Sequence, residues 1–285
     1  MTRRKLIVEF TKMSGAGNDF IVIDNRFYHF SDAELTKLAR RWCARRTGVG
    51  ADGLLAFALP GDEAHHFRMR YVNADGTTSM CGNGARCLAR FARLTGVEAE
   101  ELVFETDAGP YRAQAPADPA APVRLFLPPA EGYAPDRVLE NPEGPVGTVD
   151  YLWTGTHHAV CFVPAAGQTP VDVWGPAIRR DAAFAPEGTN VDFVEVVADG
   201  QGGGRAVLRV RTYEKGVEAE TLACGTGAVA AALSARFRGL VHADVVDVRM
   251  PGGTLTVGRR GPDPEDLYLE GPADVVYRGT MEVEP

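Results

Sequence analysis

Two stretches of alternating apolar and polar residues, far apart in the chain, predict β-strands of equal length. They are Phe67–Asn73 (FRMRYVN) and Leu208–Glu214 (LRVRTYE). Each ends in a polar residue and leads into a turn that contains Gly76 or Gly216. A period of two is typical of a strand with one buried face, and glycine marks the turn that follows.

A predicted helix follows each strand, and the two helices differ in polarity. The second helix, from residue 227 to 237, is apolar almost all round, and Gly239 predicts its end. We therefore expect it to be buried within its domain. The first helix reads as amphipathic, because apolar and basic side chains recur on opposite faces. The apolar stripe is Ala85, Leu88, Phe91 and Ala92, and the other face carries Arg86, Arg90 and Arg93.

The remaining patterns predict mostly short strands. Residues 245–257 read as two strands joined by a Pro-Gly-Gly turn. Ser31 and Glu34 form a possible capping box for a helix that continues to Trp42. A Pro- and Ala-rich stretch, residues 113–122, predicts a loop near a domain boundary. The predicted class is α+β, with two mixed, mostly antiparallel sheets, each wrapped around a central helix.

The chain contains an imperfect internal repeat that extends beyond the two strands. Met80–Arg86 (MCGNGAR) follows the first strand and Ala223–Val229 (ACGTGAV) follows the second. A further similarity links Gly17–Val22 (GNDFIV) with Gly188–Val194 (GTNVDFV). Two matches in the same order indicate a duplicated domain whose related halves face each other, and the period is too long for a solenoid.

Length and charge narrow the class of protein. A chain of 285 residues predicts two domains of about 100–150 residues each. The formal net charge of −8 argues against nucleic acid or an anionic membrane as the main partner. A zwitterionic small molecule remains compatible with that charge. Basic residues precede a short apolar run at the N-terminus, but Glu9 ends it early and no stretch reaches about 18 apolar residues, so we expect a cytoplasmic protein.

The five cysteines do not predict a disulfide framework or a zinc site. Their number is odd, their spacing is irregular, and the gap between Cys81 and Cys87 matches no common zinc motif. We expect Cys43, Cys87 and Cys161 to fill core volume. The duplication of Cys81 and Cys224 at equivalent helix starts instead favours a function for these two.

Two thiols at two helix starts are suited to inverting an amino-acid α-carbon. One would remove the α-proton from one face and the other would add a proton to the opposite face, with the sulfurs about 7 Å apart. A helix N-terminus favours the thiolate, and repulsion between two thiolates keeps one thiol protonated. The free N–H groups at Gly82-Asn83 and Gly225-Thr226 could hold a carboxylate and the developing negative charge.

We expect neither a cofactor nor a metal. Pyridoxal phosphate requires a Schiff-base lysine, and none of the four lysines has a convincing cofactor setting. Adjacent His157 and His158 on a strand point to opposite faces, which disfavours a shared metal. Gly48–Gly53 (GVGADG) lacks the lysine of a nucleotide loop and predicts a turn. Asn18, Asn73 and Asn190 are either turn residues or, as the repeat favours, parts of a shared polar site.

The chain resembles the diaminopimelate epimerase family from about Phe10 to Arg249. The resemblance rests on five ordered motifs. They are Met13–Phe20 (MSGAGNDF), Asn73–Gly76 (NADG), Met80–Arg86, Tyr213–Gly216 (YEKG) and Glu220–Gly227 (ETLACGTG).

The resemblance implies reversible conversion of LL- to meso-diaminopimelate without pyridoxal phosphate, on the route to lysine. It also implies two pseudo-symmetric domains with the substrate in the cleft between them, and dimers are frequent in the family. We expect one domain of residues 1–124 plus 275–285, carrying Cys81, and one of residues 125–274, carrying Cys224. The implied site residues are the bases Cys81 and Cys224, the assisting His158 and Glu214, and the substrate-binding Asn18, Asn73, Gly82, Asn83, Thr156, Asn190, Lys215, Gly225 and Thr226.

Two departures from the family pattern concern substrate identity. Gly155–His158 (GTHH) has Thr156 where many members have asparagine, and Lys215 stands where many have arginine. Lysine keeps the charge but lacks the planar fork that grips a carboxylate in two places. The alternatives are a racemase of histidine, glutamate or a proline derivative on the same fold, and a non-catalytic amino-acid-binding protein.

Overall fold

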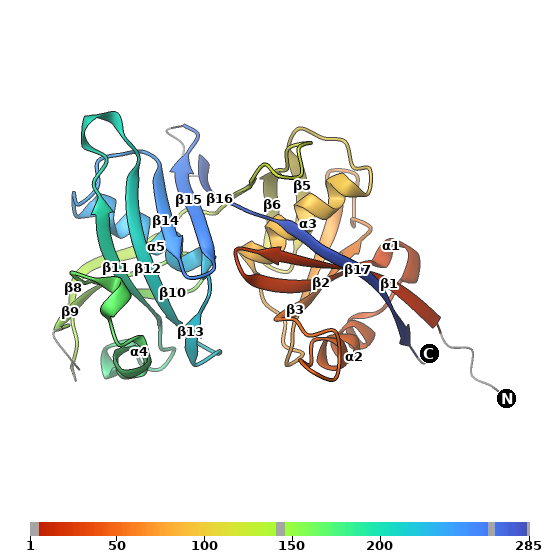
Figure 1. Ribbon diagram of the computed structural model, residues 1–285, viewed down its shortest axis with the longest axis horizontal. Coiled ribbons are helices and arrows are strands. Elements are labelled where there is room, and N and C mark those ends of the chain that lie inside the picture. The colour runs from red at the N-terminus through yellow and green to blue at the C-terminus, as the bar shows by residue number, and fades with distance from the viewer. Residues whose placement is uncertain (1–5, 141–145, 262–265, 284–285) are drawn as a thin grey trace. The chain divides into compact units, whose positions relative to one another are not determined.

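The computed structural model describes residues 6–140, 146–261 and 266–283 (Figure 1). The basic residues that open the chain lie outside these ranges. Two compact units are present: unit 1 is Met1–Leu125 with Gly271–Pro285, and unit 2 is Phe126–Glu270. None of the helices within the described ranges has both the length and the apolar character that a membrane crossing needs.

Unit 1 is a mixed sheet packed against helix α3. The strand order is β17-β1-β2-β3-β4-β5-β6, with parallel pairing in β2–β3 and β4–β5 and antiparallel pairing elsewhere. The α2 helix covers the other face with an apolar cluster centred on Trp42. The elements are β1 (Leu6–Gly15), β2 (Asn18–Asp24), α1 (Asn25–Tyr28), α2 (Asp32–Trp42), β3 (Gly53–Ala58), β4 (Phe67–Asn73), α3 (Gly82–Leu94), β5 (Leu102–Thr106), β6 (Gly109–Gln114), β7 (Val123–Phe126) and β17 (Asp274–Val283).

Unit 2 repeats this plan around helix α5. The strand order is β8-β9-β10-β11-β12-β14-β15-β16, with parallel pairing in β10–β11 and β12–β14, and β13 forms a hairpin with β12. The elements are β8 (Glu131–Val138), β9 (Thr148–Trp153), β10 (His157–Phe162), η1 (Ala166–Gln168), α4 (Val171–Arg179), η2 (Ala182–Phe184), β11 (Asn190–Ala198), η3 (Gln201–Gly203), β12 (Ala206–Glu214), β13 (Ala219–Thr221), α5 (Gly225–Phe237), β14 (Val246–Met250), β15 (Gly253–Arg259) and β16 (Leu267–Gly271).

The predicted α+β class and the central helices are confirmed. The buried residues of α5 run without a break from Gly227 to Ala235, as its apolar sequence predicts. The predicted capping box is present, because Glu34 accepts a hydrogen bond from the Ser31 backbone N–H at 2.8 Å at the start of α2. The two strands expected over residues 245–257 are β14 and β15.

The sequence of α3 is amphipathic, as predicted, but its basic face does not lie at the surface. This helix is buried on all sides from Asn83 to Ala92, and the exposed fractions of Arg86 and Arg90 are 0% and 2%. Arg90 is accommodated because its guanidinium donates to the carbonyls of Pro116 and Ala121. A long basic side chain can therefore be buried when backbone carbonyls accept hydrogen bonds from its charged end.

Strand pairing shows which segments of the repeat correspond. The predicted match of Phe67–Asn73 with Leu208–Glu214 is confirmed, because β4 and β12 occupy the same place and each precedes a central helix. The predicted match of Gly17–Val22 with Gly188–Val194 is wrong. The latter segment enters β11, which pairs as β3 does, and the counterpart of β2 is β10.

The true counterpart of Gly17-Asn18 is therefore Gly155-Thr156, immediately before β10. Gly17 and Gly155 share a positive φ, +88° and +102°, which glycine adopts without strain at these two turns. The shared letters G, N, D and F misled the sequence comparison, whereas the shared backbone conformation identifies the related turns.

Candidate active site

Cys81 is the N-cap residue of α3. Its extended backbone places the sulfur over the first turn, where Sγ accepts a hydrogen bond from the Gly84 N–H at 3.5 Å. The thiol also donates to Asn18 Oδ1 at 3.5 Å. Unlike the other four cysteines, Cys81 is partly exposed. Cys81 and Asn18, which are 63 residues apart in sequence, thus meet within unit 1.

The Asn18 amide has a defined orientation, because each of its ends is bonded. Nδ2 donates to Asp52 Oδ2 at 2.6 Å, and Oδ1 accepts from Asn83 Nδ2 at 3.2 Å as well as from Cys81. Asn83 is itself 4% exposed and accepts from Arg86 Nη2 at 2.9 Å. The sequence predicts Asn18 and Asn83 as site residues, whereas the roles of Asp52 and Arg86 follow only from these contacts.

Asp52 belongs to a charged network under this site. Arg45 bridges Asp52 and Asp19, with N–O distances of 2.8 Å to each, and Lys12 contacts Asp19 at 2.6 Å. Burial raises the pKa of Asp19, but hydrogen bonds from Arg45 and Lys12 outweigh that effect, and the pKa is lowered overall. The network places the positive charge of Arg45 beside Asp52, the acceptor for Asn18.

Asn73 lies at the end of β4, and its side chain holds the loop that leads to Cys81. Nδ2 is within 3.1–3.2 Å of oxygen atoms of Thr77 and Ser79, and Oδ1 accepts from the Tyr71 hydroxyl at 2.8 Å. These hydrogen bonds of the Asn73 side chain therefore stabilise the turn after β4, which agrees with the alternative that Asn73 is a turn residue. Its role as a substrate ligand stays a prediction.

Cys224 is the N-cap residue of α5 and is 5% exposed. Its Sγ lies 3.4 Å from Thr226 Oγ1. Burial raises the pKa of this thiol well above its ordinary value, and the charges of Glu214 and Asp192 raise it further. The surroundings of Cys224 therefore favour the protonated thiol.

A buried chain of hydrogen bonds extends from Cys224 into the core of unit 2. His158 is fully buried; Nε2 is 2.9 Å from Thr226 Oγ1 and Nδ1 is 2.6 Å from Asp192 Oδ2. Asp192 also accepts from Thr212 Oγ1 at 2.7 Å. A carboxylate on one ring nitrogen defines the tautomer and orientation of the imidazole. The structure thus connects His158 to Cys224 through Thr226, and adds Asp192, which sequence reasoning missed.

Three further predicted ligands lie around this chain. Asn190 is buried; Nδ2 donates to the His157 carbonyl at 3.0 Å and Oδ1 accepts from the Lys215 N–H at 2.8 Å. Thr156 lies in the β9–β10 turn, whose Thr154 hydroxyl donates to the Thr226 carbonyl at 3.0 Å. Asn190 therefore shapes the turn that carries Lys215, and a direct contact of Asn190 with substrate stays a prediction.

The other cysteines are core residues, as predicted. Cys43, Cys87 and Cys161 are buried free thiols. Burial raises the pKa of Cys43 and of Cys87 to about 12 and that of Cys161 well above its ordinary value. Burial therefore keeps these three thiols neutral near pH 7, as expected of residues that fill core volume.

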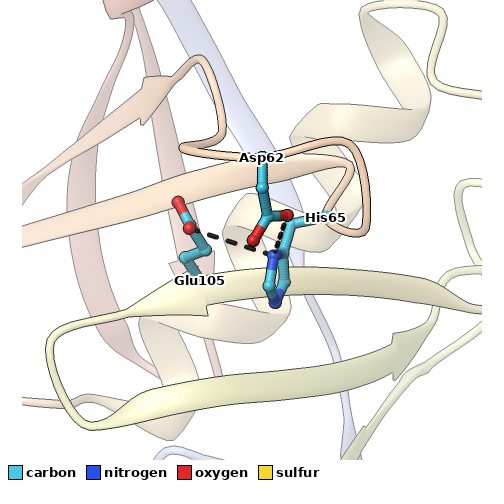
Figure 2. Close-up of side chains that lie close together, drawn as sticks. All are labelled: Asp62, His65 and Glu105. Carbon is cyan, nitrogen blue, oxygen red and sulfur yellow. Dashed lines mark hydrogen bonds and ion pairs between the residues drawn. The ribbon is translucent and has the colours of Figure 1, made fainter.

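The adjacent histidines have separate environments. His157 stacks on Tyr151 with ring centroids 5.4 Å apart, whereas His158 faces Asp192. Within the described ranges, the side chains close enough to share a metal are Asp62, His65 and Glu105, at the loop before β4 and on β5 (Figure 2). Asp62 already accepts from His65 Nδ1, at 2.6 Å, and from the Ala64 N–H. These hydrogen bonds stabilise the loop that contains Asp62 and His65, which explains why the three side chains lie close together.

Solved structures show that the fold of this chain is a known one. A hydroxyproline epimerase from Agrobacterium vitis aligns with a TM-score of 0.69 over 100% of this chain and 95% of its own, at 16% identity. A probable proline racemase from Agrobacterium radiobacter aligns with a TM-score of 0.67 over 98% and 94%, at 18% identity. The chain has the fold of these isomerases.

Sequence comparison identifies the family within that fold. The diaminopimelate epimerase family model matches residues 10–124 and 151–276. A diaminopimelate epimerase from Chlorobaculum tepidum is 42% identical over 271 residues, which cover 94% of this chain and 99% of that protein. The chain belongs to the diaminopimelate epimerase family.

Proposed function

We propose that this protein interconverts LL- and meso-diaminopimelate by a two-base mechanism in which Cys81 and Cys224 act on opposite faces of one α-carbon. The observation that carries the proposal is the equivalent position of the two thiols. Each is the N-cap residue of the buried helix of its own unit, in a chain of this family.

In the proposed reaction one sulfur acts as thiolate and the other as thiol. The thiolate takes the α-proton, the electron pair of the C–H bond remains on the substrate, and the second thiol delivers its proton to the opposite face. The charge that develops on the carboxylate would be stabilised by helix N–H groups at Gly82-Asn83 and Gly225-Thr226. Turnover in the reverse direction exchanges the two roles.

We assign the polar groups near each sulfur to two tasks, proton transfer and substrate binding. Asn18 offers an acceptor to Cys81, and Thr226 relays contact between Cys224 and His158. We propose that Glu214 and His158 assist proton transfer, and that Asn73, Asn190, Thr156 and Lys215 contribute to substrate binding. Lys215 would pair with the distal carboxylate as a single charge.

The setting of the activity is part of the same proposal. Interconversion of diaminopimelate isomers belongs to lysine biosynthesis, and we propose a cytoplasmic homodimer that needs neither pyridoxal phosphate nor another cofactor. Light scattering on the purified protein tests the dimer. Full activity after exhaustive dialysis against a chelator and after carbonyl-reagent treatment tests the cofactor claim.

Isotope exchange tests the reaction directly. The pure protein is incubated in heavy water with LL-diaminopimelate and with a panel of histidine, glutamate and hydroxyproline. The proposal predicts deuterium at the α-carbon of diaminopimelate alone, lost in Cys81→Ala and in Cys224→Ala. Exchange confined to another amino acid would identify a different racemase, and tight binding without any exchange would identify a binding protein.

The two departures from the family pattern make the panel necessary. Thr156 and Lys215 differ from the residues of many members, and both belong to the part of the site assigned to substrate. A separate experiment tests whether the two sulfurs can approach each other. Mild oxidation should form a Cys81–Cys224 disulfide that abolishes isotope exchange, and a reductant should restore the exchange. Unchanged exchange after complete oxidation would contradict the two-base arrangement.

A further inference from the structure

The guanidinium of Arg86 is a buried charge for which the proposed reaction has no assigned use. Arg86 is fully buried in α3. Within the described residues its side chain makes one hydrogen bond, from Nη2 to Asn83 Oδ1. Among the residues that the structure describes, Nε and Nη1 are buried without a hydrogen-bond partner. An uncompensated charge in a protein interior is costly, so its presence calls for a nearby negative charge.

The groups that can supply that charge are thiols. Burial lowers the pKa of Arg86, and the interactions that oppose this effect come from Cys87 and Cys81. Cys87 is completely buried with a pKa of about 12, so it remains a neutral thiol at neutral pH. Cys81 is partly exposed at the helix N-terminus, which leaves its sulfur as the site for the anion.

We propose that Arg86 is a positioning residue that favours the thiolate of Cys81 and thereby makes Cys81, rather than Cys224, the anionic member of the resting pair. This inference rests on the proposed function for its consequence in catalysis. The interaction between Arg86 and Cys81 lies within unit 1.

Both protonation states of Cys81 have a partner in this arrangement. The thiol donates to Asn18 Oδ1, and the thiolate keeps the Gly84 N–H and the positive charge of Arg86. Arg86 also determines the direction of the amides. Because it can only donate, it holds the Asn83 oxygen and turns Asn83 Nδ2 toward Asn18.

Two nearby carboxylates, Asp52 and Asp274, have contacts of their own. Asp52 lies behind Asn18 and is itself paired with Arg45, and Asp274 of β17 acts on Cys87 and Arg90. Unit 2 has no equivalent cation on its helix, because the residue five positions after Cys224 is Val229. Burial, followed by the charges of Glu214 and Asp192, instead raises the pKa of Cys224 and favours the protonated thiol.

The test measures Cys81 without substrate. Iodoacetamide alkylation of Cys81 in the full chain is followed by peptide mass spectrometry across a pH series, because only the thiolate reacts. Arg86→Gln should shift the midpoint upward by about one pH unit and slow alkylation at pH 7 by about tenfold. Arg86→Lys, which retains the charge, should recover most of the parent rate.

Arg90 provides the matched control. It is a buried arginine one turn further along α3, held by two backbone carbonyls. Arg90→Gln should destabilise the protein as Arg86→Gln does but leave the alkylation midpoint of Cys81 unchanged. Equal midpoints in the parent, Arg86→Gln and Arg90→Gln would overturn the proposal, as would equal shifts in both variants.

A second measurement applies even if Arg86→Gln does not fold. The pH titration of thiolate absorbance in the parent, minus that of Cys81→Ser, gives the Cys81 midpoint directly. The proposal predicts a midpoint below the free-thiol value of about 8.5, and a midpoint at or above that value would overturn it. A low midpoint that rises in Arg86→Gln, in a protein that fails to exchange deuterium, would retain the role of Arg86 and reject the proposed function.

Discussion

The two helix starts that carry the cysteines have the same backbone plan but different interiors. Below Cys224, three polar side chains from neighbouring strands are hydrogen-bonded to one another: His158 of β10, Asp192 of β11 and Thr212 of β12. They lie so close to the helix that a methyl group at Gly227 would collide with the carboxylate of Asp192.

At the corresponding positions of unit 1 the side chains are large and mostly apolar. The strand registers equate His158 with Phe20, Asp192 with Leu55 and Thr212 with Tyr71. Phe20 and Tyr71 form an edge-on aromatic pair with centroids 5.9 Å apart. A Cβ placed on Gly84 would meet Leu55 and Phe20.

Unit 1 has no carboxylate at these three positions, and its helix instead carries a cation, Arg86, where α5 has Val229. A duplicated backbone thus supplies two equivalent thiols, whereas the substitutions between the halves make their electrostatic surroundings unlike. Placing a cation near one sulfur and carboxylates near the other is a direct way to keep one thiolate and one thiol at the same pH. The predictions below test that contrast.

The largest effect should come from removing either sulfur. Cys81→Ala and Cys224→Ala should each lower kcat by about 10²–10⁴-fold, because in the proposed mechanism each thiol transfers a proton in every turnover. A stereospecific assay of diaminopimelate isomers measures the loss. Cys161→Ala, which removes a buried thiol away from either helix start, should keep the parent kcat, and full activity of either first variant would contradict the equivalence of the halves.

Exchanging a core residue between the halves should destabilise the protein. Asp192→Leu, which introduces the residue of unit 1, leaves His158 Nδ1 and Thr212 Oγ1 buried without their acceptor. We expect the free energy of unfolding in urea to fall by about 2–4 kcal/mol. Asp247→Asn in the same unit should cost less than about 1 kcal/mol, because Asp247 pairs with the exposed Arg205. Equal decreases in the free energy of unfolding for the two variants would show that the buried hydrogen bonds of Asp192 contribute no more than a surface ion pair.

Acid should weaken both units through one carboxylate in each. Burial raises the pKa of Asp150, but hydrogen bonds from Arg238 and Ser234 lower it overall, and Asp19 is lowered by Arg45 and Lys12. A folded pKa below the unfolded value of about 3.9 contributes stability above that pH, which is lost as the pH falls through the folded pKa.

Urea unfolding from pH 7 downward checks this dependence. Asp19→Asn and Asp150→Asn should each reduce stability at pH 7 and flatten its decline below about pH 4. A decline as steep as that of the parent would show that these pairs do not control acid unfolding.

The smallest effect concerns the distal end of the substrate. Lys215→Arg should lower KM for diaminopimelate about fivefold, equivalent to about 1 kcal/mol, because the guanidinium can form two parallel bonds to a carboxylate. Steady-state kinetics measures it. Lys37→Arg on the exposed face of α2 should leave KM unchanged, and an unchanged KM in Lys215→Arg would place Lys215 away from the substrate carboxylate.

The sequence by itself determined the class, the duplication, the helix starts that carry Cys81 and Cys224, and the family, because these depend on local periodicity and on ordered motifs. Tertiary structure decided what the side chains contact. Arg86 and Arg90 lie on a polar face by helical spacing, yet the sheet encloses them. The counterpart of Asn18 is Thr156 rather than a residue of the 188–194 segment, because strand pairing defines equivalence. Asp52 and Asp192 acquire importance only when β3 and β11 align beside their neighbours, since a buried carboxylate acts through contacts that no single segment of the chain contains.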